Sequence, residues 1–314
     1  MEVPRTLRAM GARAFSGCER LGTIYVEDGC GCYLSRANVP VSARIVFPQE
    51  TAVSGVPLSR LRELKKVVVP DGAERVGSYW FWASHVESVE IPASVAEVGV
   101  EAFCNCARLK RLVFGTGRPV RGAEASTRSA SRLKTICANA FHRCVSLTGV
   151  RLPDGLEEIG LYAFSQSGLE SLAVPSSVRT IRQGAFCQCL GLRKVALGEG
   201  LETLGTGELT EGGEQWQGVF EGSGLEKVRL PETLKRIEYG AFRDCRNLKG
   251  VQFPSTLEEI GLRAFEGSGF ESVTTPLAVR IIHQSAFCRC QNLKRVVLNE
   301  GLEVLGINEY HDDT

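Results

Sequence analysis

A recurring phrase built around phenylalanine restricts the fold of this chain more than any other feature. The phrase reads G-x-x-A-F-x-x-C/S-x-x-L-x-x-V-x-L-P-x-x-L-x-x-I. Its phenylalanines fall 23, 22, 34, 22, 23 and 22 residues apart, at Phe141, Phe164, Phe186, Phe220, Phe242, Phe265 and Phe287. A unit this short cannot bury an apolar face alone, so its neighbours must stack on it. The period therefore predicts a solenoid, in which each repeat forms one coil.

The repeat also predicts the domain organisation. We expect one solenoid over residues 1–314, although this length would otherwise suggest two globular domains. Within it we expect degenerate repeats at 16–66, regular repeats at 67–306, and insertions at 115–131 and 206–217. The first and last residues both match the inside of a repeat, so we expect a piece of a longer protein. Cys30 and Cys32 lie in the degenerate part and receive no predicted role.

Each regular repeat contains one stretch that predicts a strand. In Lys227-Val228-Arg229-Leu230-Pro231 the alternation places Val228 and Leu230 inward, with Lys227 and Arg229 outward. The proline ends the strand, a second short L-x-x-I segment follows, and G-x-x-A-F then forms a corner that can hold one helical turn. The predicted fold is an α/β right-handed solenoid, with a parallel sheet on one face and short helical or irregular turns on the other.

The twelve cysteines are interpreted as packing residues. Six of them lie three residues after a repeat phenylalanine, in an inward column where cysteine acts as a small hydrophobe. From Cys144 on, this column alternates Cys and Ser, so successive cysteines are two coils apart and too distant for a disulfide. The three C-x-C pairs lie three or four repeats apart and cannot share one zinc ion. The four histidines form no recognisable triad, so we predict no catalytic residue, metal or cofactor.

Charges in the L-x-x-I segments change sign from one repeat to the next. The alternation runs through Glu97, Lys134, Glu157-Glu158, Arg179, Glu202, Lys235-Arg236, Glu258-Glu259, Arg280 and Glu303. Opposite charges on neighbouring strands attract, and like charges repel. We interpret these charges as specifying which coils stack on each other, and we exclude them from the candidate ligand site.

The outward strand positions are the first candidate for recognition. Seven of ten such positions are basic, and the candidate binding residues among them are Arg151, Lys194, Lys227, Arg229 and Arg295. Serine and glycine fill many other outward positions, which predicts a smooth face. Such a face can receive an acidic protein segment or a sulfated or sialylated glycan. The alternative is a solvated surface that keeps the sheet soluble.

The second candidate is Trp216, in the acidic insertion TGELTEGGEQWQ. Tryptophan is enriched in binding hot spots, and loops often provide specificity in solenoids. The alternative is that Trp216 folds back onto the corner of the coil.

Several function classes are disfavoured by composition. The net charge is +1, which gives no field for nucleic acid. No run approaches the ~18 apolar residues of a spanning helix, so we expect no membrane insertion. The N-terminus MEVPRTLRAMGARAF has no apolar core of a signal peptide.

The repeat phrase resembles the BspA-like subclass of leucine-rich repeats. The residues that carry the likeness include Ala163-Phe164, Leu169, Leu172, Val174-Pro175, Val178 and Ile181. The resemblance implies a right-handed solenoid without catalytic residues, and a cell-surface protein that binds host or matrix proteins. The alternatives are an intracellular scaffold or regulatory module, and the recognition region of a larger enzyme.

Overall fold

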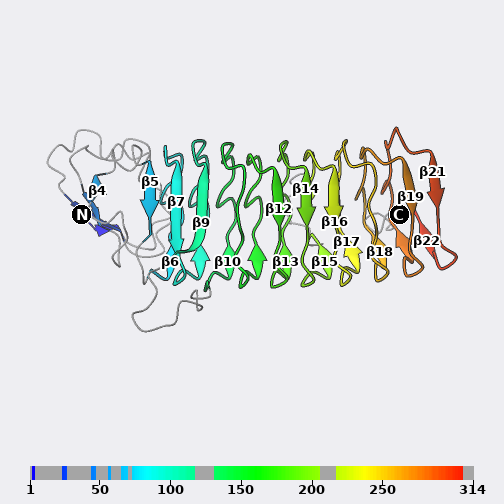
Figure 1. Cartoon of the computed structure of the whole chain (residues 1–314), viewed down its shortest axis with the longest axis horizontal. Helices are drawn as coiled ribbons and strands as arrows, with labels where there is room; N and C mark the ends of the chain where they lie inside the picture. Colours follow the sequence, from blue (N-terminus) through cyan, green and yellow to red (C-terminus); the bar gives the residue numbers. More distant parts are fainter. Residues whose placement is uncertain are drawn as a thin grey trace, which may run out of the picture.

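The computed structural model describes residues 65–69, 73–116, 131–205 and 217–306, together with the backbone of four short strands nearer the N-terminus. These parts contain strands and turns but no helix. The coils stack side by side along the long axis, from β5 near one end to β21 and β22 at the other (Figure 1). Trp216, Cys30, Cys32 and most of both predicted insertions lie outside the described residues.

One face carries the longer strands, which pair in parallel in three groups separated by coils without an assigned strand. They are β5 (Lys66–Val68), β7 (Ser88–Pro92), β9 (Arg111–Thr116), β12 (Ser171–Ala173), β14 (Lys194–Ala196), β16 (Lys227–Arg229), β19 (Ser272–Thr274) and β21 (Arg295–Val297). The central residue is buried in β12, β14 and β19, as Leu172, Val195 and Val273 show, whereas Val228 in β16 is half-buried and Val296 in β21 is exposed. The predicted alternation is therefore confirmed in β12, β14 and β19. We call this surface the long-strand face.

The L-x-x-I segments form a second set of parallel strands, which the sequence reading did not predict. They are β6 (Arg75–Val76), β8 (Glu97–Val98), β10 (Thr135–Ile136), β11 (Glu158–Ile159), β13 (Thr180–Ile181), β15 (Thr203–Leu204), β17 (Arg236–Ile237), β18 (Glu259–Ile260), β20 (Ile281–Ile282) and β22 (Val304–Leu305). The two sets form separate rows along the stack (Figure 1). The coil therefore bonds to its neighbours on both faces.

The A-F corner is an irregular turn, so the α component of the predicted class finds no support in the described residues. The Phe103 N–H donates to the Ala140 carbonyl of the next coil at 2.8 Å, instead of to a carbonyl four residues earlier. Glu101 and Asn105, two residues before and after Phe103, have positive φ angles of 52° and 60°. Left-handed residues at this spacing are incompatible with a helical turn.

The repeat phenylalanines form one continuous stack inside the solenoid. From Phe81 to Phe287 each ring stacks on the next, with centroids 4.9–5.6 Å apart. The stack continues from Phe103 to Phe141 and from Phe186 to Phe220, although an insertion separates each pair in sequence. Both insertions therefore leave the framework of the solenoid unbroken.

Four strands nearer the N-terminus are described only by their backbone. They are β1 (Glu2–Val3), β2 (Thr23–Val26), β3 (Arg44–Val46) and β4 (Val56–Pro57). The first three pair in parallel like the later coils, whereas β4 pairs with β3 in the antiparallel sense. The prediction of degenerate repeats at 16–66 is not tested further, because most of these residues lie outside the described part.

Candidate binding surface

The long-strand face brings two of the predicted binding residues together. Lys194 and Lys227 are partners in the register of β14 and β16, and both side chains are exposed. Arg229 is also exposed and lies opposite Ala196. Arg295 lies at the C-terminal end of the same column of first strand positions, next to Ser272. Arg151 is exposed on the coil that precedes β12, and the Glu170 N–H donates to Thr148 of that coil at 2.9 Å.

Ion pairs divide these cations into two groups. Arg229 pairs with Glu199 at 3.5 Å, so its charge is partly compensated within the solenoid. Arg151, Lys194, Lys227 and Arg295 form no ion pair with any residue that the structure describes. Four of the five predicted cations of this face thus have no counter-charge among the described residues, and Lys194 and Lys227 are adjacent to each other.

A second set of alternating charges, which was not predicted, flanks this face. We call it the pre-strand charges: the residues just before β12, β14, β16, β19 and β21, with the equivalent residue of the coil between β16 and β19. They are Glu170, Arg193, Glu226, Lys249, Glu271 and Lys294. Arg193 pairs with Glu226 at 3.4 Å, and Lys249 pairs with Glu271 at 3.3 Å. The signal in the sequence was the residue immediately after the framework leucine or phenylalanine, for example Leu192-Arg193. Because Arg193 and Lys249 are compensated in these pairs, they do not add to the free charge of the face.

The predicted alternation in the L-x-x-I segments also appears as ion pairs. Lys134 contacts Glu157 at 2.6 Å, Lys235 contacts Glu202 at 3.0 Å, and Arg280 pairs with Glu303. We call these the short-strand charges. Arg179 belongs to the same series but makes no ion pair with a described residue. The pairs join neighbouring coils, which supports their interpretation as register-specifying contacts outside the binding surface.

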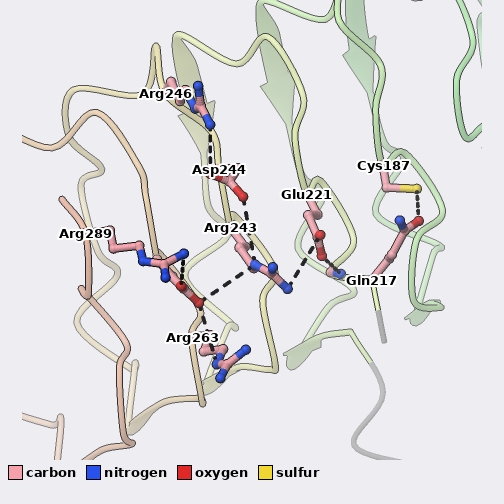
Figure 2. A network of polar contacts seen from close by, with 10 residues as sticks. Cys187, Gln217, Glu221, Arg243, Asp244, Arg246, Arg263 and Arg289 are labelled. Carbon is pink, nitrogen blue, oxygen red and sulfur yellow. Dashed lines mark hydrogen bonds and ion pairs between the residues drawn. The ribbon is translucent and has the colours of Figure 1, made fainter. Parts of the chain in front are cut away.

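A partly buried ionic network at the A-F corner was not predicted (Figure 2). Glu221, Arg243 and Glu266 each follow a repeat phenylalanine on successive coils, and both carboxylates are more than nine-tenths buried. Arg243 lies 3.7 Å from Glu221 and 3.8 Å from Glu266.

Two more arginines, Arg263 and Arg289, reach Glu266 at 3.6 and 3.5 Å. Burial raises the pKa of Glu221, while the Gly218 N–H and Arg243 partly offset that effect. The charges compensate one another across coils, although Arg243 Nε and Glu266 Oε2 are buried without a hydrogen-bond partner among the described residues, so we interpret the network as part of the packing between coils.

The described cysteines of the column are unbridged, as predicted, and all but the half-buried Cys290 are buried. All described cysteines are free thiols, and Cys106, Cys144, Cys189 and Cys245 are fully buried. Burial raises the pKa of the Cys106 and Cys189 thiols to about 11 and that of Cys245 to about 12. These thiols are protonated at neutral pH and therefore poor nucleophiles.

The remaining titratable groups also fit a packing role. His283 lies 2.7 Å from Glu259, and its side chain is almost fully buried. Burial lowers the pKa of His142. Among the described residues no group of three or more His, Cys, Asp or Glu side chains can hold a metal ion. The same part of the chain contains no helix that could cross a membrane.

Comparison with known proteins gives the family and the fold. A family model described as the BspA type leucine rich repeat region matches in six copies, over residues 51–120, 124–211 and 216–312. A leucine-rich repeat protein from Bacteroides ovatus is 23% identical with a TM-score of 0.57, covering 78% of this chain and 72% of that chain. This likeness supports the stacked-coil fold.

Two further solved structures match less closely in shape. The leucine-rich repeat protein of T. pallidum is 27% identical with a TM-score of 0.44, covering 65% of this chain and 77% of that chain. The pneumococcal vaccine antigen PcpA is 18% identical with a TM-score of 0.42, covering 98% and 85%. No curated protein matches the chain.

Proposed function

Because this chain belongs to the family of BspA-type leucine-rich repeats, we propose that it is a protein-binding module that recognises its partner with the long-strand face. Solenoids of this kind present extended surfaces in place of pockets. The repeat framework consists of packed apolar side chains and compensated charges, so we expect recognition and no catalysis from it.

One observation carries this proposal: Lys194 and Lys227 stand side by side without a counter-charge. Like charges directly opposite each other on neighbouring strands destabilise a sheet. The pre-strand charges and the short-strand charges avoid such pairs by alternating in sign. The exception at Lys194 and Lys227 therefore disfavours the isolated solenoid and favours a complex with an acidic partner.

We further propose that the full-length protein acts at the cell surface, in adhesion or recognition of another protein. The support is the family resemblance. The alternatives are an intracellular scaffold or regulatory module, and the recognition region of a larger enzyme. A signal peptide on the full gene product would favour the surface role, and its lack would favour an intracellular scaffold. A separate folded domain with catalytic activity would favour the third alternative, a recognition region of an enzyme.

The proposal is tested by capturing partner proteins on the immobilised protein and measuring the affinity of each for two variants. The first variant is Lys194→Glu with Lys227→Glu. The matched control is Arg108→Glu with Arg246→Glu, which changes the net charge equally in the exposed turns after Phe103 and Phe242. We expect the first variant to weaken binding at least about tenfold. It removes two cations that attract an acidic partner and replaces them with carboxylates that repel it. Equal affinities for both variants would reject the long-strand face as the recognition surface.

A further inference from the structure

The chain contains an internal repetition longer than one coil. Residues 140–209 and 241–310 have the same residue at more than half of their aligned positions, with a constant offset of 101 residues. The long-strand face repeats a pair of outward residues on adjacent coils, a serine followed by a cation, twice within this pattern and once before it. The pairs are Ser88 with Arg111, Ser171 with Lys194, and Ser272 with Arg295, and each is aligned in the strand register.

The first of these three units neutralises its own cation. Glu90, two residues after Ser88, lies 3.5 Å from Arg111 and 2.9 Å from Lys66. The equivalent residues in the other two units are Ala173 and Thr274. These side chains cannot neutralise a cation, so Lys194 and Arg295 make no ion pair with the described residues. We call the first unit closed, because its cation is neutralised by Glu90, and the other two open, because their cations are not neutralised.

The coil before each open unit places glycine on the long-strand face. Gly149 precedes Ser171 and Gly250 precedes Ser272 in the same outward column, where the first unit has Lys66. Neither glycine has a positive φ, and a Cβ at either position would meet no atom within 4 Å. The fold therefore does not require glycine there. Both glycines lie in coils without an assigned long strand, and the missing side chain leaves their backbone open to close approach by another molecule.

We propose that the two open units are equivalent subsites for one acidic, extended protein segment that lies along the solenoid axis. Subsite 1 consists of Gly149, Ser171 and Lys194, with Lys227 beside it, and subsite 2 consists of Gly250, Ser272 and Arg295. This proposal rests on the proposed function and adds the chemistry and reach of the partner. Lys194 and Arg295 are four coils apart, or about 19 Å at the usual strand spacing.

The surroundings of the subsites favour a peptide over a glycan. The outward positions of the described long strands carry no aromatic side chain, so a sugar ring finds no apolar platform. Between Lys227 and Arg295 this column carries only Gly250 and Ser272, which allows a main chain to lie close to the sheet. An extended peptide rises about 3.3 Å per residue, so about six residues separate the groups that contact Lys194 and Arg295.

The length of the ligand provides the test. Oligoglutamate peptides of about four and about twelve residues are titrated against the whole protein by fluorescence anisotropy. The short peptide reaches one subsite, whereas the long one spans both and gains affinity by effective concentration. We expect the long peptide to bind at least about tenfold more tightly per molecule than the short one. A heparin-derived oligosaccharide of similar length is the comparison ligand.

Three variants distinguish this mechanism from general electrostatic attraction. Arg295→Glu should remove the advantage of the long peptide while leaving its affinity close to that of the short peptide. Ala173→Glu with Thr274→Glu should copy the arrangement at Glu90, close both subsites and abolish binding of either peptide. Arg108→Glu with Arg246→Glu is the charge-matched control and should preserve the ratio. Circular dichroism confirms that every variant is folded.

Each other outcome overturns the proposal. Equal affinities for long and short peptides, or no peptide binding at all, would exclude paired subsites. Tighter binding of the oligosaccharide with the same response to the variants would assign the face to a sulfated glycan. If Lys194→Glu with Lys227→Glu weakens a captured partner while Arg295→Glu does not, the proposed function stands and the second subsite is rejected.

Discussion

At the scale of single residues, the buried thiols of the Cys/Ser column form the same hydrogen bonds in several coils. The Cys245 thiol donates to the Phe220 carbonyl at 3.2 Å, and the Ser223 hydroxyl lies 3.4 Å from the same sulfur. Cys106 and Cys189 make the same contact with the phenylalanine of the preceding coil, at 3.0 and 3.1 Å. The column thus links these coils to the ones before them, because the thiol donates a second hydrogen bond to a phenylalanine carbonyl that already accepts from a backbone N–H, as Phe220 does from Ser223.

This column predicts a loss of stability at alkaline pH. The pKa of the Cys245 thiol rises from 9.0 to about 12 in the fold because of burial. The unfolded chain therefore releases this proton above pH 9 while the folded chain keeps it until about pH 12. The contribution of this thiol to the free energy of unfolding is fully present below pH 9. Between pH 9 and about 12 it falls by about 1.4 kcal/mol per pH unit.

The measurement is urea unfolding of the wild type and Cys245→Ala between pH 8 and 11, under reducing conditions. At pH 8 the variant should be less stable by about 1–3 kcal/mol, because it leaves a cavity and removes the donor to Phe220. Above pH 9 this difference should shrink by about 1.4 kcal/mol per pH unit. Val219→Ala is the control, a buried truncation without a titratable group, and its effect should not change with pH. A pH-independent effect of Cys245→Ala would contradict the account.

At the scale of elements, the short-strand charges determine which coils can be neighbours. Lys235 contacts Glu202 at 3.0 Å, and its backbone carbonyl accepts from the N–H of Glu258 on the next coil at 2.8 Å. The cation therefore lies between two coils that carry glutamates. Arg179, the residue that sequence alone would suggest for a test, makes no ion pair with a described residue, so Lys235 is the sharper choice.

We expect Lys235→Glu to lower the free energy of unfolding by about 1 kcal/mol, because three carboxylates then follow one another on adjacent strands. In a protein of this size that corresponds to a Tm lower by about 1–2 °C in differential scanning calorimetry. Adding Glu202→Lys should restore part of the loss. Lys235→Gln, which removes attraction without adding repulsion, should have a smaller effect. An unchanged Tm for Lys235→Glu would show that these charges do not specify register.

At the scale of the whole molecule, the two charge sets combine into a unit of two coils. From Glu170 to Glu303, a coil with an acidic pre-strand residue has a basic short-strand residue, and the next coil has the reverse. The buried column follows the same alternation, with Ser223 on one coil and Cys245 on the next. A solenoid is stabilised by contacts between neighbouring coils. Because these contacts need opposite charges on neighbours, a coil cannot be replaced by the next coil along the chain.

Deletion of coils tests this unit. Removing residues 221–242 takes out one coil and places Arg193 beside Lys249 and Glu202 beside Glu258. Removing residues 221–265 takes out two coils and keeps opposite charges as neighbours. We expect the first deletion to cost more stability per coil, measured by urea unfolding, since like charges then face each other on two rows. An equal or smaller cost per coil for the single deletion would contradict a two-coil unit.

The sequence determined the framework, because a framework residue has the same environment in every coil. The spacing of Phe141, Phe164 and Phe186 predicted stacking, and the alternation in Lys227-Val228-Arg229 predicted which side chains face the core. The alternating glutamates and cations predicted contacts between neighbouring coils. Each of these inferences uses only the spacing of residues in the sequence, because that spacing determines where a residue lies in its coil.

Only the tertiary structure decided which corners are turns, which segments pair and which charges remain free. The L-x-x-I segments are too short to read as strands until neighbouring coils supply their hydrogen bonds. Arg229 is compensated by Glu199 and Arg111 by Glu90, whereas Lys194 is not, and the repeat pattern treats all three alike. The physical reason is that an ion pair forms over a few ångströms between side chains of different coils. Its existence depends on side-chain direction and reach, which a one-dimensional period does not contain.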